Sequence, residues 1–156
     1  MSTVVTNPAQ FLKVLHEDLK GLVEPLAGRV LMARDPYHAL ELLVASPAAF
    51  FCVVLDKGDG PDQQGPVVWL NQQVGVFVAQ NRGLEVDESK NLLSLTERCT
   101  LVHDRVMSKV YPGETTEKHP KYQGKSLVTL PDGMPLSAYE LNFSLRLAGS
   151  NLSYRS

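Results

Sequence analysis

The chain has 156 residues, of which 44% are hydrophobic, and its 15 basic and 17 acidic side chains give a formal net charge of -2. A chain of this length buries about 70% of the surface that it exposes when unfolded, so it can fold as one domain without a metal or a disulfide. Because the charges are spread along the chain, no basic stripe is available for a phosphate backbone, and we expect no sequence-specific binding of nucleic acid. No segment approaches the roughly 18 apolar residues of a membrane span and the N-terminus does not resemble a signal peptide, so we expect a soluble, cytoplasmic protein without a membrane partner.

The first predicted element is an amphipathic helix. Asn7 is placed as its N-cap, Pro8 at its first position and Gln10 as the partner in a capping box. Apolar residues then recur at spacings of three and four, which predicts a helix over residues 11–24. Residues 29–33 follow as a short edge strand and residues 37–45 as a second, short helix that is apolar nearly all round.

The middle of the chain predicts a hairpin with a long tip. Residues 50–55 form a continuously apolar run, typical of a strand that is covered on both faces. Residues 56–66 are polar and rich in Gly and Pro, which indicates a loop too long for a tight turn. Residues 67–70 and 74–79 return as strand, and Gly75 is expected to mark a bulge.

The last third predicts a helix, a loop and two strands. Ser94 and Glu97 form a second capping box, which opens a helix over residues 95–110. Residues 114–124 read as an exposed loop, and residues 125–130 as a strand. Residues 139–147 alternate strictly between apolar and polar, the pattern of a strand with one wet face.

These elements predict a single α+β domain over residues 1–156, with loose ends at residues 1–6 and 149–156. Two helical stripes need a common apolar surface, and the last strand has only one apolar face. We therefore expect a mostly antiparallel sheet with the two main helices packed on one face.

We expect no catalytic, cofactor or metal site, and hence no enzyme. The four histidines fall in four different predicted elements without metal-ligand spacing, and no nucleophile-elbow, phosphate-loop or dinucleotide-binding motif occurs. Asp56, Asp59 and Asp62 resemble a calcium loop, but their spacing is not that of an EF-hand, so a charged hairpin tip is the favoured interpretation. Cys52 and Cys99 are predicted to be reduced core residues. Trp69, the single tryptophan, is open to two readings, a core residue, which we favour, or an interface anchor.

The order of these patterns carries a resemblance over most of the chain. Its features are the helix of residues 11–24, Gly28-Arg29-Val30, Ser46-Pro47 before the strand of residues 50–55, the long-tipped hairpin, the helix of residues 95–110 and the closing alternating strand. In this order the chain resembles the tail terminator (tail completion) proteins of long-tailed bacteriophages. It departs from a typical member in the apolar segment 37–45 and the long loop 114–124.

The resemblance implies a structural virion protein without an active site. Its family forms a hexameric ring that stops tail-tube growth at the head-proximal end and joins the tail to the head or neck. The implied partners are other copies of the chain, the tail-tube protein and a head or neck connector protein. Two alternatives remain open, namely another neck or head-completion protein, or a small ligand-binding α+β domain.

The two long loops are the candidate interfaces, because loops on a rigid scaffold commonly carry recognition. One is acidic and the other basic, so we expect them to meet each other across a ring interface or to face differently charged partners. The candidate interface residues are Asp56, Asp59, Asp62, Gln63, Gln64, Lys118, His119 and Lys121.

Overall fold

The computed structural model describes residues 7–26, 28–45, 50–64, 67–81, 88–109, 111–112, 117–130 and 136–147. Its elements are α1 (Pro8–Val23), the short 3-10 helix η1 (Glu24–Leu26), β1 (Arg29–Ala33), α2 (Pro36–Ala45), β2 (Phe50–Gln64), β3 (Val67–Asn81), α3 (Glu88–Ser108), β4 (Tyr111–Pro112), β5 (Glu117–Lys118), β6 (Lys121–Leu127) and β7 (Leu136–Leu147). The predicted ends, the 46–47 break and the turn near residue 132 lie outside the described residues.

Five of the strands form one twisted sheet in the order β1-β2-β3-β7-β6, and β4 and β5 form a separate pair. Strands β1 and β2 run parallel, whereas the other neighbouring pairs in the sheet are antiparallel. The fold is therefore α+β with a mostly antiparallel sheet, as the sequence predicts. The short strand β1 lies at one edge, also as predicted.

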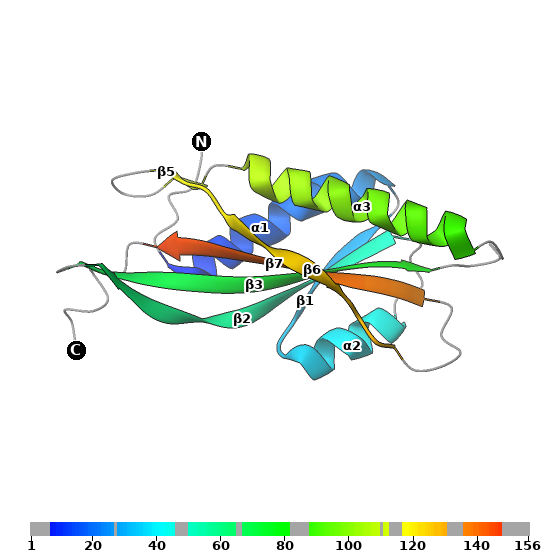
Figure 1. The fold of residues 1–156 in the computed structure, drawn as a ribbon, viewed down its shortest axis with the longest axis horizontal. Coiled ribbons are helices and arrows are strands. Elements are labelled where there is room, and N and C mark those ends of the chain that lie inside the picture. The colour runs from blue at the N-terminus through cyan, green and yellow to red at the C-terminus, as the bar shows by residue number, and fades with distance from the viewer. Residues whose placement is uncertain are drawn as a thin grey trace.

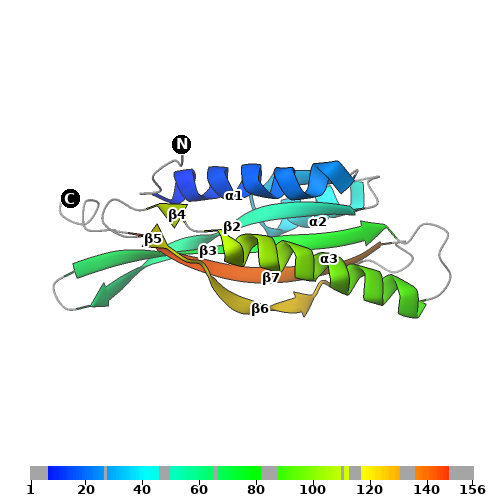
Figure 2. The ribbon, with the colours of Figure 1, turned by 90° about the horizontal axis from the view of Figure 1, so that it is seen from above.

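The helices cover the two faces of the sheet unequally. Helices α1 and α3 lie together on one face and α2 lies on the other (Figure 1, Figure 2). The two larger helices are linked where Arg105 Nε donates to Asp18 Oδ1 at 3.2 Å. The prediction that the two main helices share one face is confirmed.

Strand β2 shows why both faces of the sheet need a cover. Phe50, Cys52 and Val54 point into the core beneath α1 and α3, and the residues between them, Phe51 and Val53, point into the smaller core beneath α2. A strand that is apolar at every position cannot leave either face in water. The short helix α2, predicted over residues 37–45, provides the second cover.

The N-terminal helix begins with the N-cap residue and the proline that its sequence predicts. The Asn7 side chain accepts a hydrogen bond from the backbone N–H of Gln10 at 3.0 Å, and Pro8 occupies the first helical position. The apolar stripe is fully buried at Phe11 and Leu15, and continues through Leu19 and Val23 to the end of α1.

The prediction for the start of α3 is wrong. The helix begins at Glu88, six residues before Ser94 and well before the predicted first residue. Ser94 does not cap it, because its hydroxyl donates to Gln80 Oε1 on β3 at 3.0 Å, a bond that satisfies a serine inside a helix. The predicted buried face is confirmed at Leu95, Cys99, Val102 and Val106, whereas Val110 lies outside the described residues.

The predicted loop of residues 56–66 is also wrong, because β2 continues to Gln64 in antiparallel pairing with β3. Pro61 is tolerated there since β1 accompanies β2 only from Phe51 to Leu55, so the rest of β2 has one described neighbour and needs no second set of N–H donors. The register shift lies between Asp56 and Asp59, and Gly75, where a bulge was predicted, pairs regularly with Leu55.

The predicted loop of residues 114–124 is wrong in its second half. Glu117 and Lys118 form β5, and Lys121–Leu127 form the edge strand β6. A register shift between Tyr122 and Gly124 interrupts the pairing of β6 with β7. The alternating C-terminal strand is confirmed as β7, whose odd residues from Leu141 to Leu147 are buried.

Candidate functional site

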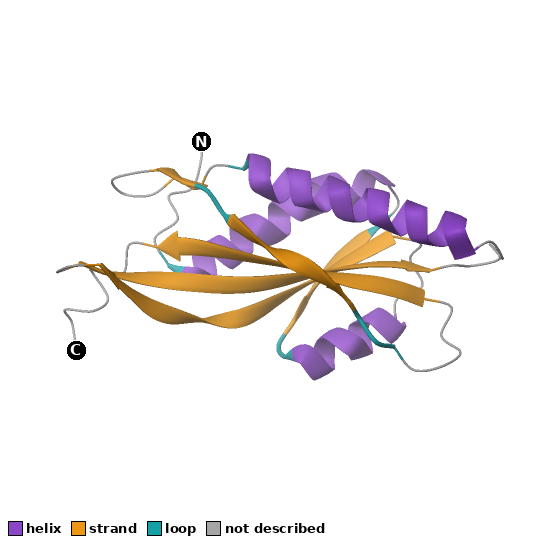
Figure 3. Ribbon diagram, viewed as in Figure 1, coloured by secondary structure: helices purple, strands orange, loops and turns teal. Residues whose placement is uncertain are grey.

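The far halves of β2 and β3 form an arm that runs past the helices (Figure 3). Strand β7 pairs with the arm as far as Leu70 of β3, and beyond that residue the arm is two-stranded. We define the arm as residues 56–64 of β2 with their partners, residues 67–74 of β3. Asp56, Lys57, Asp59 and Pro61 are exposed on it. The side chains of Asp62, Gln63, Gln64 and Trp69 lie outside the described part of the structure, although their backbones belong to the ladder.

A buried glutamine holds the bend at the base of the arm. Gln72 is fully buried, and its Nε2 donates to Asp56 Oδ1 at 2.7 Å and to the Gln73 carbonyl at 2.8 Å, with the Gly58 carbonyl at 3.2 Å. Asp56 Oδ1 also accepts from the Gly58 backbone N–H at 2.8 Å. Asp56 therefore fixes the bulge. Across the described residues, no group of three acidic, cysteine or histidine side chains is placed to hold a metal ion.

On the face of the sheet that α2 covers in part, an ion pair crosses from the arm to β7. Lys57 Nζ lies 3.1 Å from Glu140 Oε2 and 2.9 Å from Asn142 Oδ1, two strands away. It reaches them over Gly75, where an added Cβ would lie 2.6 Å from Glu140 Oε2. The absence of a side chain at Gly75 therefore makes room for this pair, which accounts for the glycine that the sequence placed in a bulge.

The acidic and basic candidate residues lie on different strands, which are separated across the width of the sheet. Asp59 pairs with Gln72 on β3, and Lys121 pairs with Ser144 on β7, so strands β3 and β7 separate them. At about 4.8 Å per strand this is about 14 Å, too far for a direct contact within one chain. His119 and Lys121 are exposed, and the side chain of Lys118 lies outside the described part.

Three stretches of sheet edge have no neighbouring strand among the described residues. One is the outer side of the short strand β1, and the second is the outer side of the arm, since β1 stops at the level of Leu55. The third is β6, whose side chains are exposed almost throughout and which carries Lys121 and Lys125. Lysines on an edge strand discourage indiscriminate strand addition, so they favour a partner with acidic side chains.

Exposed apolar side chains lie on or beside both edge strands of the sheet, β6 and β1. Leu127 of β6 is 64% exposed, and Tyr37 of α2 is 80% exposed. Tyr37 borders an apolar hollow with Leu40, Glu41 and Val44, and Met32 of the neighbouring strand β1 is also exposed. Tyr37, Leu127 and Met32 keep a large part of their apolar surface exposed, which is therefore available for contacts with another molecule.

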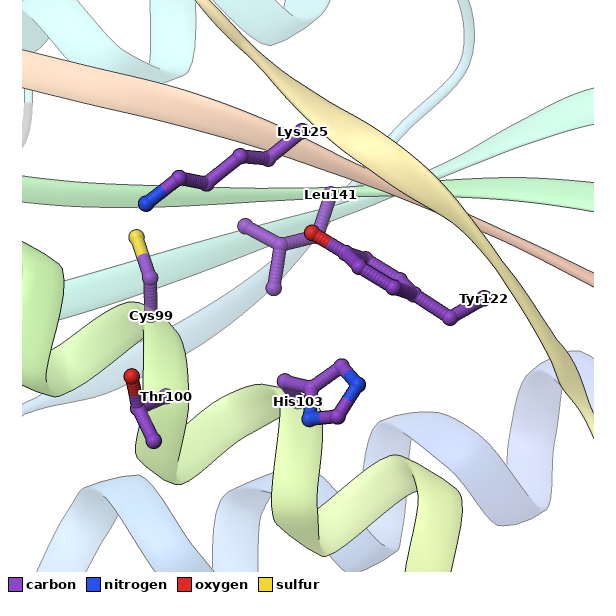
Figure 4. Close-up of a pocket in the computed structure, with 6 residues that line it drawn as sticks. All are labelled: Cys99, Thr100, His103, Tyr122, Lys125 and Leu141. Atoms are coloured by element: carbon purple, nitrogen blue, oxygen red, sulfur yellow. The ribbon is translucent and has the colours of Figure 1, made fainter.

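A separate cavity of about 210 Å³ lies between α3 and the β6–β7 pair. Figure 4 shows the residues that line it, which are Cys99, Thr100, His103, Tyr122, Lys125 and Leu141. The Lys125 ammonium extends towards the Cys99 thiol and sits 4.6 Å from the centre of the Tyr139 ring. The sequence does not indicate this site, because Tyr122 falls in a predicted loop and only the strand pairing brings it opposite His103.

The histidines make local contacts within the described residues. His16 Nε2 lies 3.3 Å from the Val30 carbonyl, and His38 Nδ1 accepts from the Arg34 N–H at 3.1 Å. His103 Nδ1 lies 2.9 Å from Asp104 Oδ1, and its ring meets that of Tyr122 edge-on at 4.6 Å. These contacts orient the three rings, and none of them joins two histidines.

Both cysteines are free and buried, as predicted. Burial raises the pKa of Cys99 to about 11, partly opposed by the ammonium of Lys125, and burial raises the pKa of Cys52 even further. Both thiols are therefore protonated at neutral pH and lack the thiolate that nucleophilic chemistry requires.

The chain matches no known protein-family model and no curated protein sequence. In the described part of the chain, no helix is both long enough and apolar enough to cross a membrane.

Proposed function

We propose that the protein is a structural virion subunit that forms a ring, most simply a hexamer, at the head-proximal end of a phage tail tube. In this role it ends the tube and joins the tail to the head or neck. The proposal takes its biological setting from the resemblance to tail terminator proteins. The observation that supports a ring is that the arm and β6 are open edges of one sheet and differ from each other.

Unlike edges favour a ring over a two-fold dimer. A two-fold contact uses the same patch on both partners, whereas a contact between two different patches repeats head to tail and closes when the rotation permits. The outer side of the arm offers a nine-residue length of β2, and β6 offers seven residues. We propose that the arm of one protomer lies against β6 of the next.

Charge is complementary across this proposed contact. The arm presents Asp59, while β6 presents Lys121. Exposed pairs of this kind contribute about 0–1 kcal/mol each, so they set the register and speed encounter more than they hold the ring. Exposed apolar groups such as Leu127 supply the cohesive contacts.

Light scattering on the free protein and on a mixture with its tail-tube protein tests the proposal. We expect a protomer or ring alone, and a ring stably bound to tube ends in the mixture. A ring bound to the head connector but not to tubes would support a neck or head-completion protein instead. A protein that stays monomeric in both samples would contradict the ring.

A further inference from the structure

The cavity between α3 and β6 combines an apolar floor with a polar rim. Leu141 and Cys99, which are almost fully buried, form the floor. Lys125, Tyr122, Thr100 and His103 surround the opening. An apolar cavity of about 150 Å³ holds one benzene ring, so the volume of about 210 Å³ has room for one ring and a small polar group.

The strand bulge in β6 creates this rim. Tyr122 pairs with Phe143 and Lys125 pairs with Leu141, and both β7 partners face α3. In a regular strand, residues three apart point to opposite faces, so Tyr122 and Lys125 share a face only because of the extra residue at the bulge. Gly124 adopts a φ of 109° there, a conformation that other residues rarely adopt.

Lys125 gives the rim a positive charge. Among the described residues it makes no ion pair with a carboxylate, in contrast to Lys57, which is held by Glu140. The face of the Tyr139 ring stabilises the ammonium and leaves its hydrogens free to donate elsewhere. The neighbouring Cys99 thiol is neutral, so it does not cancel this charge.

We propose that this cavity binds a carboxylate attached to an apolar body of about one aromatic ring. The body lies against Leu141 and Cys99, and the carboxylate accepts hydrogen bonds from the Lys125 ammonium and the Tyr122 hydroxyl. Such a group is presented either by a free small acid or by the C-terminal residue of a polypeptide. The site is distinct from the arm and does not depend on the ring.

Titration of the monomeric protein with benzoate, followed by NMR, tests the site. Benzoate is expected to shift the Leu141 methyl and Thr100 signals saturably, with a dissociation constant on the order of 1 mM for so small a ligand. Benzamide, which has the same shape without the charge, is expected to bind at least tenfold more weakly, because a hydrogen bond between charged groups is lost.

Two lysine variants test whether the Lys125 ammonium binds the carboxylate. Lys125→Met keeps the stem and removes the ammonium, so it should weaken benzoate about tenfold and leave benzamide unchanged. Lys121→Met is the matched control, because it lies on the same strand but pairs with Ser144, on the opposite face of the sheet. It should bind benzoate as the parent protein does.

N-acetylphenylalanine distinguishes the two sources of the carboxylate. Tighter binding of this compound than of benzoate indicates a polypeptide C-terminus, and the reverse order indicates a free acid. The proposal is overturned if neither acid gives saturable shifts at the cavity. It is equally overturned if each acid binds no better than its amide, or if Lys121→Met weakens binding as much as Lys125→Met.

Discussion

Replacing Gln72 with Met should loosen the arm and lower the stability of the whole domain. The substitution keeps the length of the buried side chain and removes its two shorter hydrogen bonds, to Asp56 Oδ1 and to the Gln73 carbonyl. At about 1–1.5 kcal/mol each, these contribute about 2–3 kcal/mol. Gln72 Oε1 is buried with no partner among the described residues. Removing this oxygen therefore raises the free energy of unfolding by about 1 kcal/mol and offsets part of the loss.

The net loss for Gln72→Met is therefore about 1.5 kcal/mol in the free energy of unfolding, or roughly 3–6 °C in Tm for a chain of this size. Urea denaturation measures the stability, and hydrogen exchange measures protection of the Gly58 amide, which loses the support of Asp56. Gln73→Met, an exposed neighbour, should change the stability by less than about 0.5 kcal/mol. Equal stability and equal Gly58 protection in the parent and Gln72→Met proteins would refute this reasoning.

Three further predictions concern the core, the thiols and the proposed interface. Leu15→Ala, which truncates a fully buried side chain of α1, should cost about 3 kcal/mol in urea denaturation, whereas Leu26→Ala, at a half-exposed position, should cost less than about 0.5 kcal/mol; equal costs would contradict the packing. The Cys99 thiol has its pKa raised from 9.0 to about 11, so its contribution to stability is complete below pH 9 and is lost as the pH rises to 11. Cys99→Ala should accordingly lose less stability than the parent protein between these pH values, and identical pH profiles would exclude the thiol as a cause. Reversal of charge at Asp59 or Lys121 alone should slow ring assembly measured by light scattering, and reversal of both together should restore it; unchanged assembly in all three proteins would remove these charges from the interface.

Helix α1 and strand β7 were predictable because their signals are local. The Asn7 cap and the stripe from Phe11 onward lie within one segment, and both are realised in α1. For the same reason, the alternation of apolar and polar residues predicted which face of β7 is buried. Where a pattern is complete within one element, sequence alone determines the element and its buried face.

The arm was not predictable from local signals. Gly58, Gly60 and Pro61 are typical of turns, yet β2 continues through them because β3 supplies a partner over the whole length. Pro61 fits only because β1 has already ended on that side. That condition depends on the relative lengths of three strands, which no local pattern contains.

The cavity was missed for a related reason. Cys99, Thr100 and His103 share one side of α3, which helical spacing allows. Tyr122 and Lys125, however, join them only through pairing with β7 and a bulge at Gly124. Both features depend on the register between strands that are distant in sequence. No local pattern could therefore indicate that these residues line one cavity.

A cryo-electron microscopy map of the junction between head and tail tests the central claim most directly. The account predicts a ring of this protein at the head-proximal end of the tail tube, with each arm seated against β6 of the next protomer. A map in which that position is filled by another protein, or in which protomers meet through two-fold contacts, would contradict it.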